Sequence, residues 1–592
     1  MRFKLTKTTV FLTIIFLLAI LLRILVATHV VIGSDELVYS SIPINILSAE
    51  RVSTAYQSHL YFYLLDASYK LFGGVTPLST RFPSVLFGSF AVFVVFLLGH
   101  HLFGRTEGLI AAFLFAVSGY ALRYNVETDM PAFFLAALSV LFFLYGLRDA
   151  RPLWFYLSTL FLVLAVSVKN ILLLFVPIYV LIFILYDHRF HRFFISALSR
   201  RFSIQKRFVL MFVFSAIISL IILSPIFVYN FLLYKDRDVT DFYFSTVIGL
   251  GKAAYSGLEN NPWSFSTLKK VLYKKIDQFF RYDPVIFIFG FIGAFFSFRR
   301  RKIETMLLLF TLIFLFMYLG GVTGSPSHYL WVPLVLSVFA SPALLSFHDR
   351  VLSSFHFRYF LTLFFVVLLS LTIFLSWDVL TLKNSVLSLR EYVSENIPKD
   401  AIVVLDPRIY SGIFAWAFHD VHYLDGTLFP QFSALLEQAS SAPKTRMPIY
   451  YIECGKGTEC IWGKEDYQRI YDSAEELTTF FKARTKEVAR VTGEAIKQGD
   501  RHTFIVYAGS LEAPSEVYEL IDRSHIFWFY PVGWKYTDQL PDGYITRGLW
   551  YTFDRFGLII SYLNLILAVL SLPFTLFVIA RRDSLFGGDV HG

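Results

Sequence analysis

The sequence LWFYLSTLFLVLAVSVKNILLLFVPIYVLIFILY, residues 153–186, is apolar over nearly its whole length. As a single helix at roughly 1.5 Å per residue it would exceed about 50 Å, whereas the hydrocarbon core of a bilayer is about 30 Å thick. The segment SVKN, residues 167–170, contains three polar residues including Lys169 and interrupts the apolar run. We therefore expect two membrane helices, near 153–168 and 170–186, that meet at Lys169.

The composition of the chain favours the same class of protein. Of 592 residues, 56% are hydrophobic and 66 are Phe, and the mean hydropathy is +0.59. A soluble enzyme cannot hide that much apolar surface in its cores. About twelve runs have the length and polarity of membrane helices. They lie near 9–30, 82–102, 108–123, 130–147, 153–168, 170–186, 208–233, 284–298, 304–321, 328–347, 359–378 and 555–580.

Lys and Arg gather in short segments between these runs. If the N-terminal MRFKLTK is cytoplasmic, every other segment on that side is basic, as the positive-inside rule requires. These segments are FGRTEG, LRDARP, residues 187–207, FRRRK, HDRVLSSFHFR and RRDSLFGG. We expect a multi-pass plasma-membrane protein with both termini in the cytoplasm. The same pattern accounts for the net charge of +9, so we expect no nucleic acid partner.

The outer side then receives one segment large enough to be a domain. Residues 379–554 have an ordinary polar composition, with strand-like runs AIVVLD and TFIVYAG and a helical pattern over SAEELTTFFKARTKEVARV. We predict a small mixed α/β extracytoplasmic domain there. It would separate a membrane domain at 1–378 from a last helix and tail at 555–592. The other outer pieces are 31–81, RYNVETDMP and 234–283.

We make structural predictions for two smaller features of the predicted outer side. The segment HLYFYLLDASYKLFG, residues 59–73, is too short to span and mixes Tyr, Asp and Lys with Leu and Phe. We expect it to lie along the membrane interface. The two cysteines, Cys454 and Cys460, either bridge one small loop or remain a free, inert pair.

Two pairs of acidic residues lie on the predicted outer side. Asp35 and Glu36 follow the first helix in VVIGSDELVYSS, and Glu127 and Asp129 lie in VETDMP. A partly desolvated carboxylate at the bilayer edge suits a general base, and paired carboxylates suit a hard divalent cation. The alternatives are a first pair that simply meets water and an Asp129 that caps a helix, with Pro131 in its first turn.

Basic residues accompany the acids. Lys169 between two membrane helices is either functional or a snorkelling lysine, and Arg23 inside the first helix either snorkels or pairs with an acid. The segment TLKKVLYKKIDQFFRYDP is amphipathic, which suits either the anionic lipids of a membrane surface or a solvated charged face. Its basic residues are Lys269, Lys270, Lys274, Lys275 and Arg281. Further basic residues at outer helix ends are His59, Arg81, Arg123 and His328.

Carboxylates and cations that face each other at a membrane boundary suit transfer from a membrane-bound anionic donor. A carboxylate would deprotonate an acceptor while cations hold a lipid phosphate. Glycosidases need a second carboxyl group to protonate a poor leaving group. A phosphate leaves as an anion, so one base and cationic stabilisation suffice.

The order of motifs resembles one family of membrane enzymes. After a first helix with an Arg come GSDELVYS, SHLYFYLLDASYKLFG, STRFPSVLFGSFAVFVVFLLG, RYNVETDMPAFFLAALSVLFFLYG, LAVSVKNILLLFVPIYVLI and SPSHYLWVPLVL. Over roughly 1–380 the chain resembles the GT-C superfamily of polyprenyl-phosphate-sugar glycosyltransferases, in the branch of protein O-mannosyltransferases and the lipid A aminoarabinose transferase. This resemblance implies a GT-C fold. The short loop after the seventh helix and the domain before the last resemble an archaeal or bacterial member.

The resemblance implies roles for the acidic residues. Asp35 is the implied general base, supported by Glu36, and Glu127 and Asp129 match the second outer acidic motif. In the related oligosaccharyltransferases such acidic pairs hold a divalent cation, whereas the mannosyltransferase branch does not need one. The use of Mg²⁺ or Mn²⁺ is therefore left open.

The resemblance also implies contacts to the donor phosphate. Lys169 matches the lysine of an L-x-K-G region, and His328 with Tyr329 matches an R-Y-L-x-x-P region. His328 stands where Arg is usual, Asn170 stands where Gly is usual, and SHLYFY lacks the usual prolines, so these contacts depart from the family pattern. The remaining candidates for the same role are Arg81, His59 and Arg123.

The predicted reaction is an inverting transfer of a hexosyl or pentosyl group at the outer membrane face. The donor would be a dolichyl or undecaprenyl phosphate sugar, and the acceptor a hydroxyl of a protein, lipid or glycan. The alternative is an oligosaccharyltransferase that uses a lipid-linked glycan, although its WWDxG motif is not found here. A secondary transporter would place charges in mid-helix within inverted repeats. A membrane-anchored scaffold would not depend on Asp35.

Overall fold

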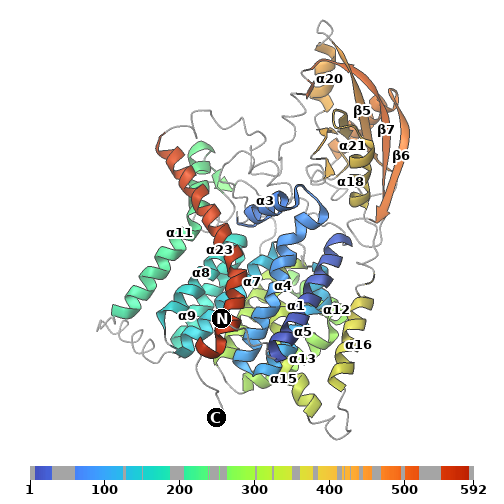
Figure 1. Cartoon of the computed structure of the whole chain (residues 1–592). Helices are drawn as coiled ribbons and strands as arrows, with labels where there is room; N and C mark the ends of the chain where they lie inside the picture. Colours follow the sequence, from blue (N-terminus) through green and yellow to red (C-terminus); the bar gives the residue numbers. More distant parts are fainter. Residues whose placement is uncertain are drawn as a thin grey trace.

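The computed structural model of the chain is a bundle of apolar helices with a five-stranded sheet domain at one end (Figure 1). The structure describes residues 7–29, 60–124, 128–149, 151–186, 206–237, 239–240, 252–253, 263–299, 303–322, 326–349, 360–375, 377, 385–409, 417–418, 420–426, 429–438, 444–455, 468–494, 501–515, 517–518 and 548–585.

The apolar runs of the sequence form helices. They are α1 (Lys7–His29), α4 (Pro77–Leu102), α5 (Arg105–Ala116), α6 (Gly119–Tyr124), α7 (Asp129–Asp149), α8 (Pro152–Val168), α9 (Phe175–Tyr186), α11 (Lys206–Arg237), α13 (Pro284–Arg299), α14 (Ile303–Val322), α15 (Trp331–Phe347), α16 (Phe360–Leu375) and α23 (Leu549–Leu585). Among the described residues, seven helices are long and apolar enough to cross a membrane. A bent pair, α12 (Phe265–Tyr282) and α13, would make an eighth. The prediction of a polytopic helical membrane protein is confirmed.

The predicted interruption at Lys169 is confirmed. Helix α8 ends at Val168, Lys169 is extended, and the 3-10 helix η2 (Asn170–Leu174) leads into α9. A buried polar contact joins the helices around this break. The Ser139 hydroxyl of α7 donates to the Ser158 carbonyl of α8 at 2.7 Å and lies 3.0 Å from the Tyr179 hydroxyl of α9.

The prediction of a single helix near 108–123 is wrong in one respect. The chain leaves the helical conformation between the end of α5 at Ala116 and the start of α6 at Gly119. Side chains from distant helices bind the carbonyl groups that the break releases. The Arg23 guanidinium of α1 donates to the Ala116 carbonyl at 3.3 Å, and the Thr372 hydroxyl of α16 donates to the Val117 carbonyl at 2.9 Å. Backbone within a bilayer needs such partners. Arg23 is buried, so it neither snorkels nor pairs with a described acid.

The sheet domain follows the membrane helices in sequence. Its strand order is β4, β3, β5, β7, β6, with β3 parallel to both neighbours and β7 antiparallel to both neighbours. The predicted strands AIVVLD and TFIVYAG lie in β3 and β7 and are confirmed. The elements are α18 (Ser385–Asn396), β3 (Ile402–Leu405), β4 (His422–Asp425), α20 (Phe429–Gln438), β5 (Thr445–Cys454), α21 (Gln468–Lys482), β6 (Thr485–Glu494) and β7 (Arg501–Ala513).

The helical pattern over 473–491 is only half right. Its first part forms α21, but the chain then turns into β6, which pairs with β7 along its length. The stretch TKEVARVT carries β-branched Thr and Val, which favour a strand once a partner edge is present. A bulge between Glu487 and Ala489 shifts the register and disguises the period-two alternation.

Two smaller predictions, for residues 59–73 and for the cysteines, can be compared with the structure. The segment predicted at the interface forms the helix α3 (Leu60–Phe72), which lies across the end of the bundle below the sheet domain (Figure 1). Cys454, at the end of β5, is disulfide-bonded. The bridged alternative for the two cysteines is therefore confirmed, while Cys460 itself lies outside the described residues.

Candidate active site

Three charged or titratable side chains from distant parts of the sequence meet at the ends of the membrane helices. Asp129 is the first residue of α7, Lys169 follows α8, and His328 lies in the 3-10 helix η4 (Ser327–Tyr329). The Lys169 ammonium donates directly to one Asp129 carboxylate oxygen. The Nδ1 of His328 lies 2.8 Å from the Lys169 Nζ and 3.2 Å from the other Asp129 oxygen.

This charge cluster is largely shielded from water. The side chains of Asp129, Lys169 and His328 are 0%, 7% and 16% exposed. Such burial is tolerable only because the charges pair with each other. Lys169 is thus an ion-paired residue rather than a snorkelling one. His328 Nδ1 accepts from Lys169 when unprotonated and donates to Asp129 when protonated.

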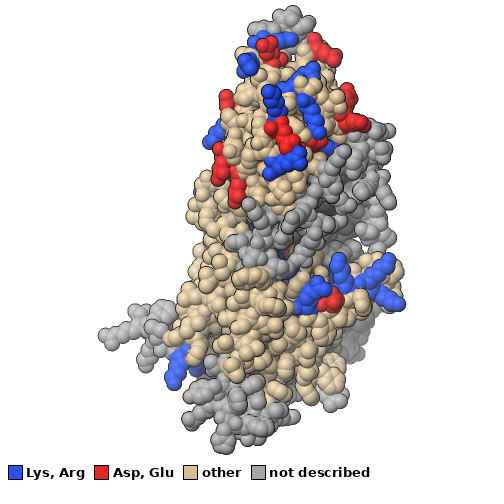
Figure 2. Space-filling view, turned by 90° about the vertical axis from the view of Figure 1, so that its right-hand side faces the viewer, with Lys and Arg blue, Asp and Glu red and all other residues tan. Residues whose placement is uncertain are grey.

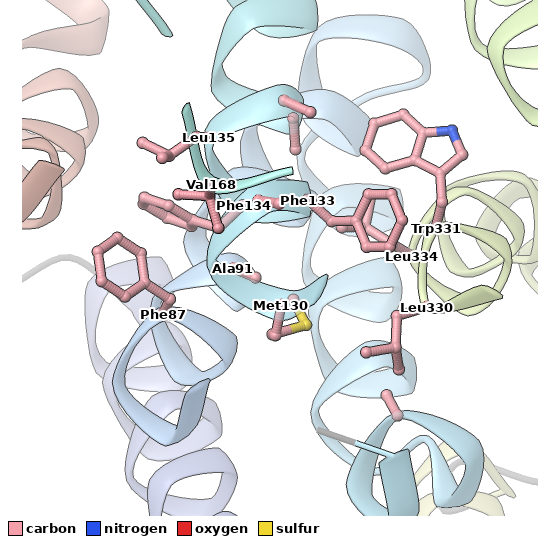
Figure 3. Close-up of a cluster of buried hydrophobic side chains, with 14 of the residues drawn as sticks. Phe87, Ala91, Met130, Phe133, Phe134, Leu135, Val168, Leu330, Trp331 and Leu334 are labelled. Atoms are coloured by element: carbon pink, nitrogen blue, oxygen red, sulfur yellow. The ribbon is translucent and has the colours of Figure 1, made fainter. Parts of the chain in front are cut away.

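An apolar core fixes the backbone on either side of the charge cluster (Figure 3). Each charged residue has a buried apolar neighbour in the chain: Met130 after Asp129, Val168 before Lys169, and Leu330 shortly after His328. One turn further along α7, Phe133 lies 5.8 Å from the ring of Trp331 at the start of α15. Because close-packed side chains resist displacement, the three polar groups are held in place.

Lys275 of α12 is a third basic group, and it lies against Tyr329, the residue after His328. Its side chain is fully buried, its Nζ lies 4.6 Å from the centre of the Tyr329 ring, and it donates to the Gln278 amide oxygen at 2.9 Å. Among the described residues no carboxylate forms an ion pair with it. Sequence reasoning counted Lys275 with its solvated neighbours. Its helical spacing from Leu268, Val271 and Phe279 was the signal that it faces inward.

A capped helix connects these elements. The Asp283 carboxylate, between α12 and α13, accepts from the Ser118 hydroxyl at 2.6 Å and from the backbone N–H groups of Gly119 and Tyr120 at 2.7 and 3.2 Å. The Tyr120 hydroxyl in turn donates to the Pro326 carbonyl, next to η4, at 2.8 Å. Carboxylates stabilise helix N-termini, so Asp283 fixes α6 against the elements that carry Lys275 and His328.

Comparison with known proteins identifies the architecture. Residues 57–229 match a family described as dolichyl-phosphate-mannose-protein mannosyltransferase. The crystal structure of ArnT from Cupriavidus metallidurans bound to undecaprenyl phosphate is similar, with a TM-score of 0.55 and 12% identity over 84% of this chain and 97% of ArnT. The crystal structure of the same ArnT in the apo state has a TM-score of 0.55 and 12% identity, over 85% of this chain and 98% of ArnT. The chain has the GT-C fold.

The family match and the GT-C fold together support a membrane glycosyltransferase. The Archaeoglobus fulgidus oligosaccharyltransferase in its apo form aligns with a TM-score of 0.46 and 16% identity, over 76% of this chain and 70% of that protein. No curated protein matches the GT-C chain.

Arg81 and Arg123 of the GT-C chain support helix ends. The buried Arg81 guanidinium of α4 donates to the Ala27 carbonyl near the end of α1 at 2.7 Å. Arg123 of α6 lies 4.8 Å from the ring of Tyr282 at the end of α12. Tyr329 is buried against Lys275, as described above. Of the proposed phosphate contacts, the structure therefore brings Lys169, His328 and Tyr329 together.

The remaining predicted site residues, Asp35, Glu36, His59 and Glu127, lie outside the described residues. Their roles stay predictions. Within the part of the chain that the structure describes, no group of three or more His, Cys, Asp or Glu side chains is placed to hold a metal ion. Asp129 is instead committed to Lys169 and His328.

Proposed function

We propose that this GT-C chain transfers a sugar from a polyprenyl phosphate to an acceptor hydroxyl at the outer face of the membrane, with inversion at the anomeric carbon. The observation that carries the proposal is the excess of buried positive charge at the helix ends. Asp129 is paired with Lys169 and His328, and Asp283 binds the N-terminus of α6, so no carboxylate among the described residues pairs with the buried Lys275. Such an excess suits a phosphate that leaves as an anion.

The proposed chemistry needs one general base and positively charged side chains beside the leaving phosphate. Asp35 takes the proton of the acceptor hydroxyl while the hydroxyl oxygen attacks the anomeric carbon of the donor. The bond between that carbon and the phosphate oxygen breaks, and the electron pair leaves with the polyprenyl phosphate. Lys275 and the Lys169–His328 pair stabilise the negative charge on the leaving phosphate. The step balances without a metal ion, although a divalent cation at Asp35, Glu36 and Glu127 is compatible with it.

Two further features support this proposal. ArnT, whose fold this chain shares, has been crystallised with undecaprenyl phosphate. The disulfide at Cys454 belongs to a compartment that is oxidising, which favours an extracytoplasmic sheet domain. The sheet domain and α3 lie at the same end of the bundle (Figure 1), which supports the proposal of an extracytoplasmic active site.

The test is sugar release from a panel of radiolabelled polyprenyl phosphate sugars by the purified chain in lipid nanodiscs. We expect turnover of one donor, and a loss of about 10²- to 10⁴-fold in kcat for Asp35→Asn, as for removal of a general base. Asp400→Asn, the same change at an exposed carboxylate of the sheet domain, is the matched control. A parallel reaction with chelator decides whether a metal ion takes part.

Three outcomes would contradict the proposal. Turnover of diphosphate-linked glycans alone would assign the chain to the oligosaccharyltransferase reaction. Equal rates for Asp35→Asn and wild type would remove Asp35 as the base. Absence of turnover with every donor, together with unchanged donor binding in the variant, would favour a scaffold.

A further inference from the structure

Helix α12 presents three separate rows of side chains. One row faces the bundle and is buried, namely Leu268, Val271, Lys275, Phe279 and Tyr282. A second row is exposed and mostly apolar, namely Phe265, Leu272, Ile276 and Phe280, with Tyr273 beside it. A third row is exposed and charged, namely Lys270, Lys274, Asp277 and Arg281, and the exposed Lys269 lies within the second row, four residues after Phe265 and three before Leu272. Each row repeats at helical spacing, so each belongs to one side of the helix.

The direction of α12 differs from that of the spans. It bends by 114° from α13, so its axis runs across the membrane helix that follows it. The bend is at Asp283, whose carboxylate binds the N-terminus of α6. Because both partners of this contact are buried, the bend is a fixed part of the fold.

The exposed apolar row of α12 would be unfavourable in contact with water. Phe265 is 70% exposed and Tyr273 is 80% exposed, on a helix that also carries the charged row. A helix with one apolar and one charged exposed side, set across the spans, matches the pattern of helices that lie in the plane of a membrane interface. The apolar row then enters the acyl region and the charged row reaches the headgroups.

The charged row has a clear sign. Lys270, Lys274 and Arg281 of this row, together with the neighbouring Lys269, oppose a single acidic residue, Asp277, which lies 3.9 Å from Arg281. Figure 2 shows a mainly blue group midway down the molecule, apart from the mixed red and blue surface of the sheet domain and bordered below by a largely tan zone. An excess of exposed Lys beside an apolar row attracts anionic lipid headgroups.

We infer that α12 binds the headgroups of anionic phospholipids in the bilayer leaflet nearest the sheet domain, through Lys269, Lys270 and Lys274. This surface is separate from the proposed donor site, because these three lysines are exposed while Lys275 is buried against the Tyr329 ring. The bound headgroups hold the inward row of α12, and with it Lys275, at the height of the membrane surface.

The test is local lipid selectivity, measured without any sugar transfer. Tyr273→Cys is labelled with a fluorophore in the full chain, where Cys454 is already disulfide-bonded. The labelled chain is placed in nanodiscs that contain equal fractions of brominated phosphatidylglycerol or brominated phosphatidylcholine. We expect at least about twofold stronger quenching by the anionic lipid, and loss of this preference near 1 M salt, where screening acts within about 3 Å.

Two variants make the test specific. Changing Lys269, Lys270 and Lys274 to Gln should remove the preference while quenching by the neutral lipid stays. Changing Lys399, Lys444 and Lys486 to Gln removes the same charge from exposed positions of the sheet domain and should leave the preference intact. Equal quenching by both lipids in the wild type, no quenching at all, or loss of preference in the sheet-domain variant would each overturn the inference. None of these outcomes depends on the proposed glycosyltransferase activity.

Discussion

The charge cluster in the membrane bundle differs from a second ionic network in the sheet domain, whose carboxylates are buried and whose cations are partly exposed. In the sheet domain, Asp406 after β3 accepts from the Arg408 guanidinium at 3.0 Å and from the Cys454 backbone N–H at 3.1 Å. Glu453 in β5 accepts from Lys482 at 2.9 Å and from the Tyr507 hydroxyl at 2.8 Å. Two carboxylates thus face two cations, and the network is neutral.

In the bundle, the described residues include one buried lysine, Lys275, with which no described carboxylate pairs. Asp129 instead neutralises Lys169, and Asp283 binds the N-terminus of α6. A neutral, internally satisfied network needs no ligand, and the hydrogen bonds from Arg408 to Asp406 raise the pKa of the guanidinium. A buried lysine that no described carboxylate neutralises suits an anionic ligand. We therefore expect the network of the sheet domain to be structural and the charge cluster of the bundle to bind an anion.

The largest expected effect follows from removal of the carboxylate in the bundle. Asp129→Ala leaves Lys169 buried without its partner, which should cost about 3 to 5 kcal/mol of stability. The double variant Asp129→Leu with Lys169→Met removes both charges, so its stability should return close to that of the wild type. Thermal unfolding in detergent measures both. A double variant as unstable as Asp129→Ala would show that the ion pair is not the cause.

Activity separates the two networks further. The double variant at Asp129 and Lys169 should fold and fail to turn over donor. In the sheet domain, Asp406→Ala should cost about 3 kcal/mol, because it strands Arg408 and a buried backbone N–H. Its kcat per folded molecule should equal that of the wild type. A large loss of kcat in folded Asp406→Ala would give the neutral network a role in the reaction.

The disulfide of the sheet domain should have a smaller effect. Cys454 can bond only to Cys460, the one other cysteine in the sequence, so the closed loop is short. Loop-closure entropy for such a loop predicts a loss of about 2 kcal/mol on reduction. Thermal unfolding with and without reductant measures it, and a Cys454→Ser variant should show no further response to reductant. No change on reduction of the wild type would contradict this expectation.

The smallest expected effect has the opposite sign. Lys275→Met replaces a buried ammonium by an apolar side chain of similar length, so the ligand-free chain should become more stable by about 1 kcal/mol. A lysine retained at a cost in stability indicates a functional requirement. Destabilisation by Lys275→Met, together with unchanged kinetics, would instead make Lys275 a packing residue.

Hydropathy and charge predicted the bundle well because they act locally. The helix ends at Lys169 and the existence of the sheet domain needed only the sequence nearby. The pairing of Lys169 with Asp129 and the break before α6 depend on residues many positions away, so no local pattern reveals them. The turn from α21 into β6 similarly depends on β7, whose edge a window of sequence does not contain.

Lys275 shows where local reasoning was misleading. A lysine in a basic run ordinarily faces water, and four of the five basic residues in this run do so. The fifth lies in the apolar row at helical spacing, a position that becomes informative only when the partner of that row is known. Candidate site residues on charged helices therefore need assignment to a side of the helix before assignment to a role.

The central claim is that surplus positive charge in the bundle binds the lipid phosphate. The most direct measurement compares the affinities of undecaprenyl phosphate and undecaprenol for the wild type, Lys275→Met and Asp406→Ala in nanodiscs. We predict at least about tenfold preference for the phosphate in the wild type and Asp406→Ala, and its loss in Lys275→Met, as for one charge-assisted hydrogen bond. Equal affinity for phosphate and alcohol, or a preference that survives Lys275→Met, would contradict this account.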